Sequence, residues 1–65
     1  MQYRIRISDD SRTVSVFTDE KAVPKIARDE LKEIHGIDMN HYKVYTGPTE
    51  TGDKNLKWVT VFIKK

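Results

Sequence analysis

Sixty-five residues without a cysteine are enough for one small domain, and they exclude a disulfide framework and a thiolate zinc site. The net charge of +2 favours polyanionic partners only weakly, so composition alone does not indicate a nucleic-acid-binding protein. No apolar run is long enough to span a bilayer, and no signal-peptide block opens the chain. We therefore expect a single domain over residues 1–65, located in the cytoplasm and without a membrane partner.

Two alternating stretches open the chain. Residues 3–7 have apolar side chains at the odd positions and Arg4 and Arg6 on the other face, which is typical of a half-buried strand. Residues 13–17 resume the alternation, which leaves Phe17 on the outward face. A short polar turn lies between the two stretches, so we predict a β-hairpin.

Residues 18–36 are the only segment with helical periodicity. Pro24 would lose a hydrogen bond inside a helix, so we expect the regular helix to start near Val23, with the proline in its first turn. We expect the helix to end at His35, because Gly36 suits the left-handed position that follows a helix and the next residue can then fold back on it.

One face of this helix is apolar over an arc of about 140° and is expected to pack on the sheet. The stripe consists of Val23, Ile26, Ala27, Leu31 and Ile34. Glu30 projects into the same arc. A single acid without a base, a nucleophile or a pocket is insufficient for catalysis, so we expect Glu30 to reach past the sheet edge to a lysine or to water.

A third strand is predicted over residues 42–46, with Lys43 and Tyr45 outward. The segment 47–55 is a loop by composition and is bounded by glycines. It is similar to a phosphate-binding loop, but Asp53 stands where that loop needs its lysine, and the segment joins two strands. We therefore reject nucleotide binding.

The fourth strand, residues 57–64, is apolar at both parities except at Thr60, which is typical of a central strand. Its orientation is open. Because threonine is easier to expose than to bury, we favour the orientation that places Trp58 and Phe62 on the outward face. In the alternative orientation, these two rings lie in the core.

The element order ββαββ predicts an α+β fold with a four-stranded sheet and one helix packed on one face. A helix that crosses over the sheet sets the third strand parallel to the second, and the fourth parallel to the first. The most apolar strand belongs in the middle, which gives the strand order 2-1-4-3. The fully antiparallel order 2-1-3-4 is the alternative.

The opening residues Met1-Gln2-Tyr3-Arg4-Ile5, the single helix and the C-terminal alternating strand carry a resemblance to a known family. The chain resembles the immunoglobulin-binding domain of protein G, which has the β-grasp fold. The resemblance implies the order 2-1-4-3. No residue of the helix or the third strand matches the antibody-binding set of that family, so the resemblance assigns no functional residue.

The outward face of the predicted sheet interleaves aromatic and basic side chains. Its members are Arg4, Arg6, Phe17, Lys43, Tyr45, Trp58 and Phe62. Such a face can bind a protein partner or a second copy of the chain, because aromatic residues and arginine are enriched in interfaces. The alternative is a single-stranded nucleic acid whose bases stack on the rings. The arginines can also cover the rings without any ligand.

Other candidate sites are weak. His35, Asp38 and His41 lie close in sequence, but their spacing fits no rigid metal-ligand template. The sequence contains no nucleophile elbow and no cysteine–histidine pair, and the chain is too short to enclose a large pocket. We therefore predict a non-catalytic interaction module without a cofactor, a metal or a small-molecule substrate.

Overall fold

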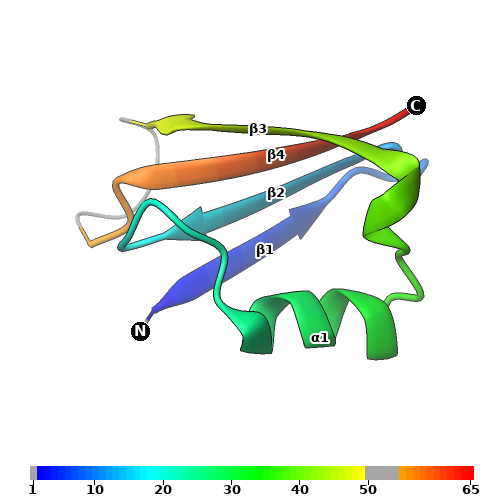
Figure 1. Cartoon of the computed structure of the whole chain (residues 1–65), viewed down its shortest axis with the longest axis horizontal. Coiled ribbons are helices and arrows are strands. Elements are labelled where there is room, and N and C mark those ends of the chain that lie inside the picture. The colour runs from blue at the N-terminus through cyan, green and yellow to red at the C-terminus, as the bar shows by residue number, and fades with distance from the viewer. Residues whose placement is uncertain (1, 50–54) are drawn as a thin grey trace.

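Four strands and one helix make up the described part of the chain, which covers residues 2–49 and 55–65 in a computed structural model. The elements are, in chain order, β1 (Tyr3–Ile7), β2 (Thr13–Thr18), α1 (Lys25–Glu33), the 3-10 turn η1 (Met39–His41), β3 (Tyr42–Pro48) and β4 (Trp58–Lys64) (Figure 1). The predicted ββαββ order and the α+β class are confirmed, with one helix and a four-stranded sheet.

The strand order is β1-β2-β4-β3, and every neighbouring pair is antiparallel. The predicted order 2-1-4-3 is wrong, and so is the alternative 2-1-3-4. The strand β4 is central, as expected, but it pairs with the second strand of the hairpin instead of the first. Charge accounts for this choice. The arginines of β1 suit an edge strand, whereas β2 has no charged residue and can be covered on both sides.

A parallel middle pair, as in the β-grasp fold, is therefore not present in the described sheet. The predicted strand directions are nevertheless correct. Because β4 is antiparallel to both β2 and β3, these two strands run parallel to each other, although they are not neighbours. The resemblance to the protein G domain stops at the order of elements along the chain.

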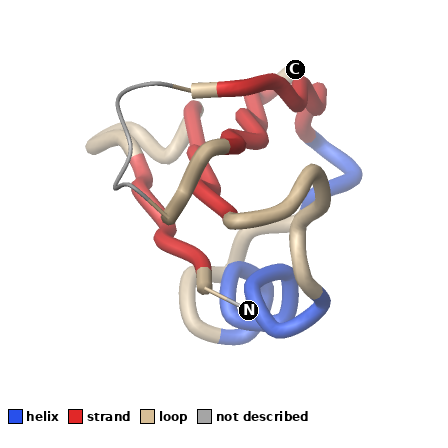
Figure 2. Tube along the Cα trace, turned by 90° about the vertical axis from the view of Figure 1, so that its left-hand side faces the viewer, coloured by secondary structure: helices blue, strands red, loops and turns tan. Residues whose placement is uncertain are grey.

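The core lies between α1 and one face of the sheet, which we call the covered face. It is built from the buried side chains Val14, Val16, Ala27, Leu31, Ile37, Tyr42 and Phe62. Figure 1 shows α1 beside β1, with β3 on the far side of the sheet. In the side view, the helix lies at the end of the molecule that holds the N-terminus (Figure 2). The helix therefore covers only part of this face, and Val44 on β3 stays 54% exposed.

The favoured orientation of β4 is wrong, and the alternative is correct. Phe62 is 4% exposed and belongs to the core, whereas Ile63 is 42% exposed. Thr60 is buried as well, and its hydroxyl lies 3.2 Å from the hydroxyl of Thr46 on β3. This hydrogen bond offsets the free-energy cost of burying the Thr60 hydroxyl. That cost was the reason for expecting Thr60 on the exposed side.

The hairpin between β1 and β2 has the predicted polar turn. The Ser8 hydroxyl donates to Asp10 Oδ1 over 2.7 Å, and the Arg12 N–H donates to the same oxygen over 3.1 Å. These two hydrogen bonds favour the ionised carboxyl and so lower the pKa of Asp10. Ser11 has a φ of 59°, a left-handed conformation that a tight turn requires here.

The helix begins at Lys25, directly after Pro24, and ends at Glu33, two residues before the predicted end at His35. The Pro24 carbonyl accepts hydrogen bonds from the N–H groups of Ala27 and Arg28, so the proline precedes the helix and breaks no bond within it. At the other end, Gly36 has a φ of 65° and the Ile37 N–H donates to the Leu31 carbonyl over 3.0 Å. The predicted left-handed glycine and the fold-back of the next residue are confirmed.

The apolar stripe of the helix is narrower than predicted. Ala27 and Leu31 are fully buried, and Val23 packs partly against the core. Ile26 and Ile34 are 64% and 71% exposed, so their predicted burial is wrong. The reason is geometric, because the short helix packs on the sheet through the line of Ala27 and Leu31. Its neighbouring face is left without a described partner.

Candidate interaction surface

The second face of the sheet has no described helix over it, and we call it the open face. Side chains alternate along each strand, so the register assigns to it Arg4, Arg6, Thr13, Ser15, Phe17, Lys43, Tyr45, Val59, Val61 and Ile63. The structure thus brings together five of the seven residues that the sequence predicted for this surface. Trp58 and Phe62 are not among them, because they lie on the covered face.

The open face has an apolar strip along its middle. The register orders its side chains in rows across the strands, Arg4–Phe17–Val59 and Arg6–Ser15–Val61–Tyr45. Phe17 and the two valines are half-buried, whereas Tyr45 is 57% exposed and Ile63 is 42% exposed. An apolar strip on β2 and β4 is therefore bordered by arginines on β1 and by Lys43 on β3.

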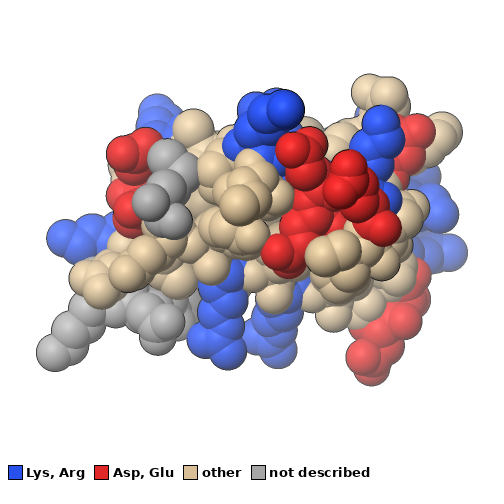
Figure 3. All heavy atoms as spheres, turned by 90° about the horizontal axis from the view of Figure 1, so that it is seen from below, with Lys and Arg blue, Asp and Glu red and all other residues tan. Residues whose placement is uncertain are grey.

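The charged residues surround this strip instead of interrupting it. Arg4, Arg6 and Lys43 are all exposed, and no described acidic residue shares the open face with them. In the view from below, two basic side chains project side by side from the lower edge of the molecule, while acidic side chains lie nearer its middle and at the right end of the same edge (Figure 3). The open face therefore combines an accessible apolar strip with positive charge on both sides.

Sequence reasoning missed the contribution of β4 to this surface, which comes from Val59, Val61 and Ile63. The strand is apolar at both parities, so its pattern contains no signal for its orientation. The one available signal was Thr46 on the neighbouring strand, which provides the hydroxyl partner for Thr60. That pairing becomes visible only when the register of β3 and β4 is known.

Trp58 has a different environment from the one predicted. It lies on the covered face at the start of β4 and is half-buried. The Lys21 ammonium lies 5.6 Å from the centre of its ring, within the range of a cation–π contact. The only tryptophan of the chain is thus shielded by a lysine from the segment before α1.

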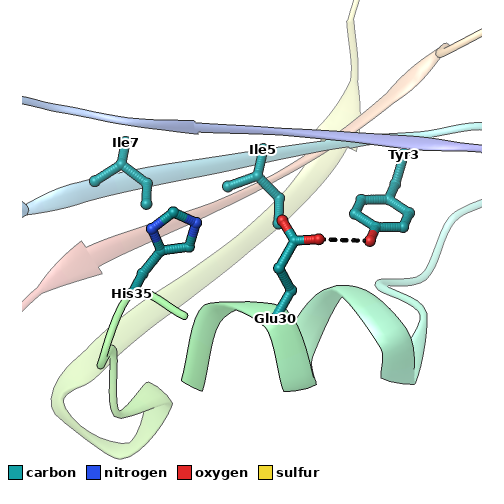
Figure 4. Close-up of a pocket in the computed structure, with 5 residues that line it drawn as sticks. All are labelled: Tyr3, Ile5, Ile7, Glu30 and His35. Carbon is teal, nitrogen blue, oxygen red and sulfur yellow. Dashed lines mark hydrogen bonds between the residues drawn. The ribbon is translucent and has the colours of Figure 1, made fainter. Parts of the chain in front are cut away.

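A separate cleft opens between β1 and α1. It has a volume of about 470 Å³ and is lined by Tyr3, Ile5, Ile7, Glu30 and His35. Figure 4 shows the three β1 side chains on one side of the cleft and the glutamate and the histidine on the other. The Tyr3 hydroxyl donates to Glu30 Oε1 over 2.9 Å. Among the described residues, Glu30 is therefore bonded to this tyrosine and not to the lysine that we expected as one alternative.

This hydrogen bond couples two titratable groups. It is made by the protonated hydroxyl, and it is the main cause that raises the pKa of Tyr3 above its usual value. Desolvation and the negative charge of Glu30 act in the same direction. The pair is partly open to solvent, and its hydrogen bond links β1 to α1.

The remaining candidates do not form a site. His41 Nε2 lies 3.5 Å from Asp38 Oδ2 near η1, while His35 lines the cleft beside β1. Within residues 2–49 and 55–65, no three histidine, cysteine, aspartate or glutamate side chains are placed to hold a metal ion. Most of the segment that is similar to a phosphate-binding loop, residues 50–54, lies outside the described residues.

No family model matches this chain, and comparisons with curated proteins and with solved structures found no match. In the described part of the chain, no helix has both the length and the apolar character needed to cross a bilayer. The inference of function therefore depends on the surfaces of this molecule alone.

Proposed function

We propose that this chain is a non-catalytic interaction module that binds a protein partner through the open face of its sheet. The observation that carries the proposal is the apolar strip on β2 and β4, accessible to solvent and bordered by cations. Protein interfaces have this composition, an apolar centre with aromatic residues and a polar, charged rim. Phe17 and Tyr45 provide the aromatic contacts, and the arginines of β1 provide hydrogen bonds and charge.

A second copy of the chain is one partner that this surface can take. Two open faces that stack would bury their apolar strips against each other, but they would also bring two sets of basic side chains together. Repulsion between these charges opposes self-association at low salt and weakens as salt screens it. A heterologous partner with an acidic rim satisfies both the apolar strip and its border, so we favour it.

Single-stranded nucleic acid is the second candidate, and it is supported by the exposed cations together with Tyr45. The orientation of β4 weakens this candidate, because Trp58 and Phe62 lie on the covered face. Only two aromatic side chains remain on the open face, on β2 and β3, and β4 separates these strands. Two strand spacings amount to about 10 Å, so adjacent bases cannot stack on both rings in the way that a continuous aromatic platform permits.

A site-specific crosslinking experiment tests the leading proposal. A photoreactive phenylalanine analogue replaces Tyr45 on the open face or, as a matched control, Lys32 on the exposed side of the helix. We expect a discrete protein adduct from position 45 that Ile63→Ser abolishes, and no such adduct from position 32. Adducts of equal yield at both positions, or none at position 45, would contradict the proposal.

Two further measurements on the same protein test the other two candidate partners, a second copy of the chain and single-stranded nucleic acid. A dilution series followed by light scattering reports self-association, which Tyr45→Ala should weaken if two open faces meet. Anisotropy of a labelled oligonucleotide reports nucleic-acid binding, which should fall steeply with salt and with the double change Arg4→Ala and Arg6→Ala. If the chain stays monomeric and does not bind the oligonucleotide at low salt, a heterologous protein is the one candidate partner left for the open face.

A further inference from the structure

The outer side of β1 is an open sheet edge with ordered hydrogen-bonding groups. The Ser8 N–H donates to the Thr13 carbonyl, which fixes the alternation of bonds along the hairpin. Antiparallel pairs alternate between bonded and non-bonded residues, so Arg6 and Arg4 bond to β2. The N–H and C=O groups of Tyr3, Ile5 and Ile7 then point away from the sheet, and no described strand lies there to receive them.

The cleft between β1 and α1 runs beside this edge. The residues with outward backbone groups are the ones whose side chains line the cleft, together with Glu30 and His35 (Figure 4). On the helix, Ile26 and Ile34 lie one turn before and one turn after Glu30, and both are mostly exposed. A free strand edge and exposed apolar side chains thus occur together on this side of the molecule.

The opposite edge of the sheet, β3, lacks these properties. The Thr49 N–H donates to the Lys57 carbonyl, so the outward groups of β3 belong to the even-numbered residues, which include Pro48. Proline has no N–H to offer to an added strand. The helix lies away from this edge, at the β1 side of the sheet (Figure 1). The two edges are therefore not equivalent, and β1 is the one suited to an additional strand.

Pairing of β1 with β1 of a second copy is disfavoured in the antiparallel registers centred on residues 4–6. If the two β1 strands paired about Ile5, Arg4 of each copy would lie opposite Arg6 of the other. Moving the centre of the pair to Arg4 or Arg6 sets an arginine opposite itself. Like charges that face each other across two strands are destabilising, and charged side chains are a common protection of edges against self-pairing. An occupant with acidic side chains avoids this repulsion and can pair with Arg4 and Arg6.

We propose that β1 accepts an extended segment of a partner protein as a fifth, antiparallel strand, and that this segment alternates acidic and apolar residues. Its acidic side chains pair with Arg4 and Arg6 on the open-face side. Its apolar side chains enter the cleft beside Ile5 and Ile7 and lie against Ile34. Main-chain hydrogen bonds to the outward groups of β1 supply the affinity, as in other strand-addition complexes. This site shares Arg4 and Arg6 with the open face, but it does not depend on the apolar strip of that face.

A synthetic peptide of about seven residues that alternates valine and glutamate, with blocked termini, serves as the probe. It is titrated into the isotopically labelled full chain, and the amide signals are followed by NMR. We expect shifts at Tyr3, Ile5 and Ile7, with slower hydrogen exchange at their amides, and little change at the already bonded Arg4 and Arg6 amides. The same amides unshifted at millimolar peptide would overturn the proposal.

Two methylated peptides test the backbone pairing. The valines lie opposite the β1 residues whose N–H and C=O groups point outward, so each valine can exchange two hydrogen bonds with β1 and the valine amides face it. N-methylation of the valine amides should weaken binding by about tenfold or more, because several hydrogen bonds are lost. N-methylation of the glutamate amides should have little effect. An equal loss from both patterns would show that no strand is added.

Charge reversal tests the specificity. A peptide with lysine in place of glutamate should bind about fivefold more weakly, since two cross-strand ion pairs become repulsions. The double change Arg4→Glu and Arg6→Glu should reverse this preference, because the side chains are exposed and their backbone bonds to β2 remain. A preference that stays unchanged would contradict the proposed acidic partner.

Surface variants separate this site from the open face. Ile34→Ser should weaken binding of the valine–glutamate peptide by about threefold, in keeping with the loss of part of an apolar contact. Lys32→Ser, on the other side of the helix, is the matched control and should have no effect. Tyr45→Ala and Ile63→Ser alter only the open face and should leave peptide binding intact. A loss of peptide binding in these two variants would assign the peptide to the open face and overturn the edge site.

Discussion

The two faces of this sheet differ less in composition than in what lies over them. On β4, the covered face holds Trp58, Thr60 and Phe62, and the open face holds Val59, Val61 and Ile63. The open side of the strand is the more apolar, yet the covered side is the more buried. Apolar composition therefore does not decide which side of a central strand is buried. The position of the helix and the presence of hydrogen-bond partners for buried polar groups decide it.

The largest expected difference between the faces is at adjacent residues of β4. Phe62→Ala should lower the free energy of unfolding by about 3 kcal/mol or more, because a large buried ring leaves a cavity. Ile63→Ala should cost at most about 1 kcal/mol, since this side chain is already 42% exposed. Urea denaturation followed by circular dichroism measures both. Equal costs would mean that β4 is not oriented as described.

Two glycines provide a comparison of backbone conformation. Gly36, which ends the helix over the covered face, has a φ of 65°, whereas Gly47 on β3 has no positive φ. A Cβ added at either position meets no atom within 4 Å, so only the backbone distinguishes them. Gly36→Ala should cost about 1 kcal/mol, and Gly47→Ala should be neutral or slightly stabilising. Thermal unfolding of the two variants checks this, and similar midpoints would argue against the left-handed cap.

Two tyrosines of β3 place their hydroxyls on opposite faces of the sheet, so removing each hydroxyl should affect stability differently. The Tyr42 hydroxyl donates to the Ser11 carbonyl over 2.7 Å and links β3 to the hairpin turn. Tyr42→Phe should cost about 1 kcal/mol, because the carbonyl loses its partner in a partly buried position. Tyr45→Phe should change stability by less than about 0.5 kcal/mol, since the side chain is mostly exposed. Denaturant titration of the pair is the measurement, and a larger loss at Tyr45 would contradict the assignment of faces.

The smallest expected effect concerns Tyr3 at the margin of the covered face. Its pKa is raised in the folded state, so its hydrogen bond to Glu30 stabilises the fold below the unfolded pKa of about 10. This contribution is lost as the pH rises through the higher folded pKa. Glu30→Gln should lower the pKa of Tyr3 toward its ordinary value, as followed by the NMR signals of the Tyr3 ring during alkaline titration. An unchanged pKa in that variant would contradict the Tyr3–Glu30 link.

The sequence by itself determined the local elements of this protein. Alternation in residues 3–7 and 13–17 gave the strands and their buried sides, because a single apolar parity leaves one choice of face. The positions of Pro24 and Gly36 bounded the helix for steric reasons that are local to the backbone. Alternation in these two strands and in residues 42–46 placed five of the seven predicted surface residues correctly on the open face.

Only the tertiary structure decided which strand neighbours β4 and which way β4 faces. Both hairpin strands have an alternating apolar face, so the sequence pattern alone cannot say which of them pairs with β4. The arginines of β1 decide the choice, because they stay hydrated when β1 is at the edge of the sheet. Likewise, an apolar strand with one threonine has no intrinsic orientation until Thr46 comes within hydrogen-bond distance of Thr60. Local sequence specifies local conformation, whereas pairing and burial depend on partners that are distant along the chain.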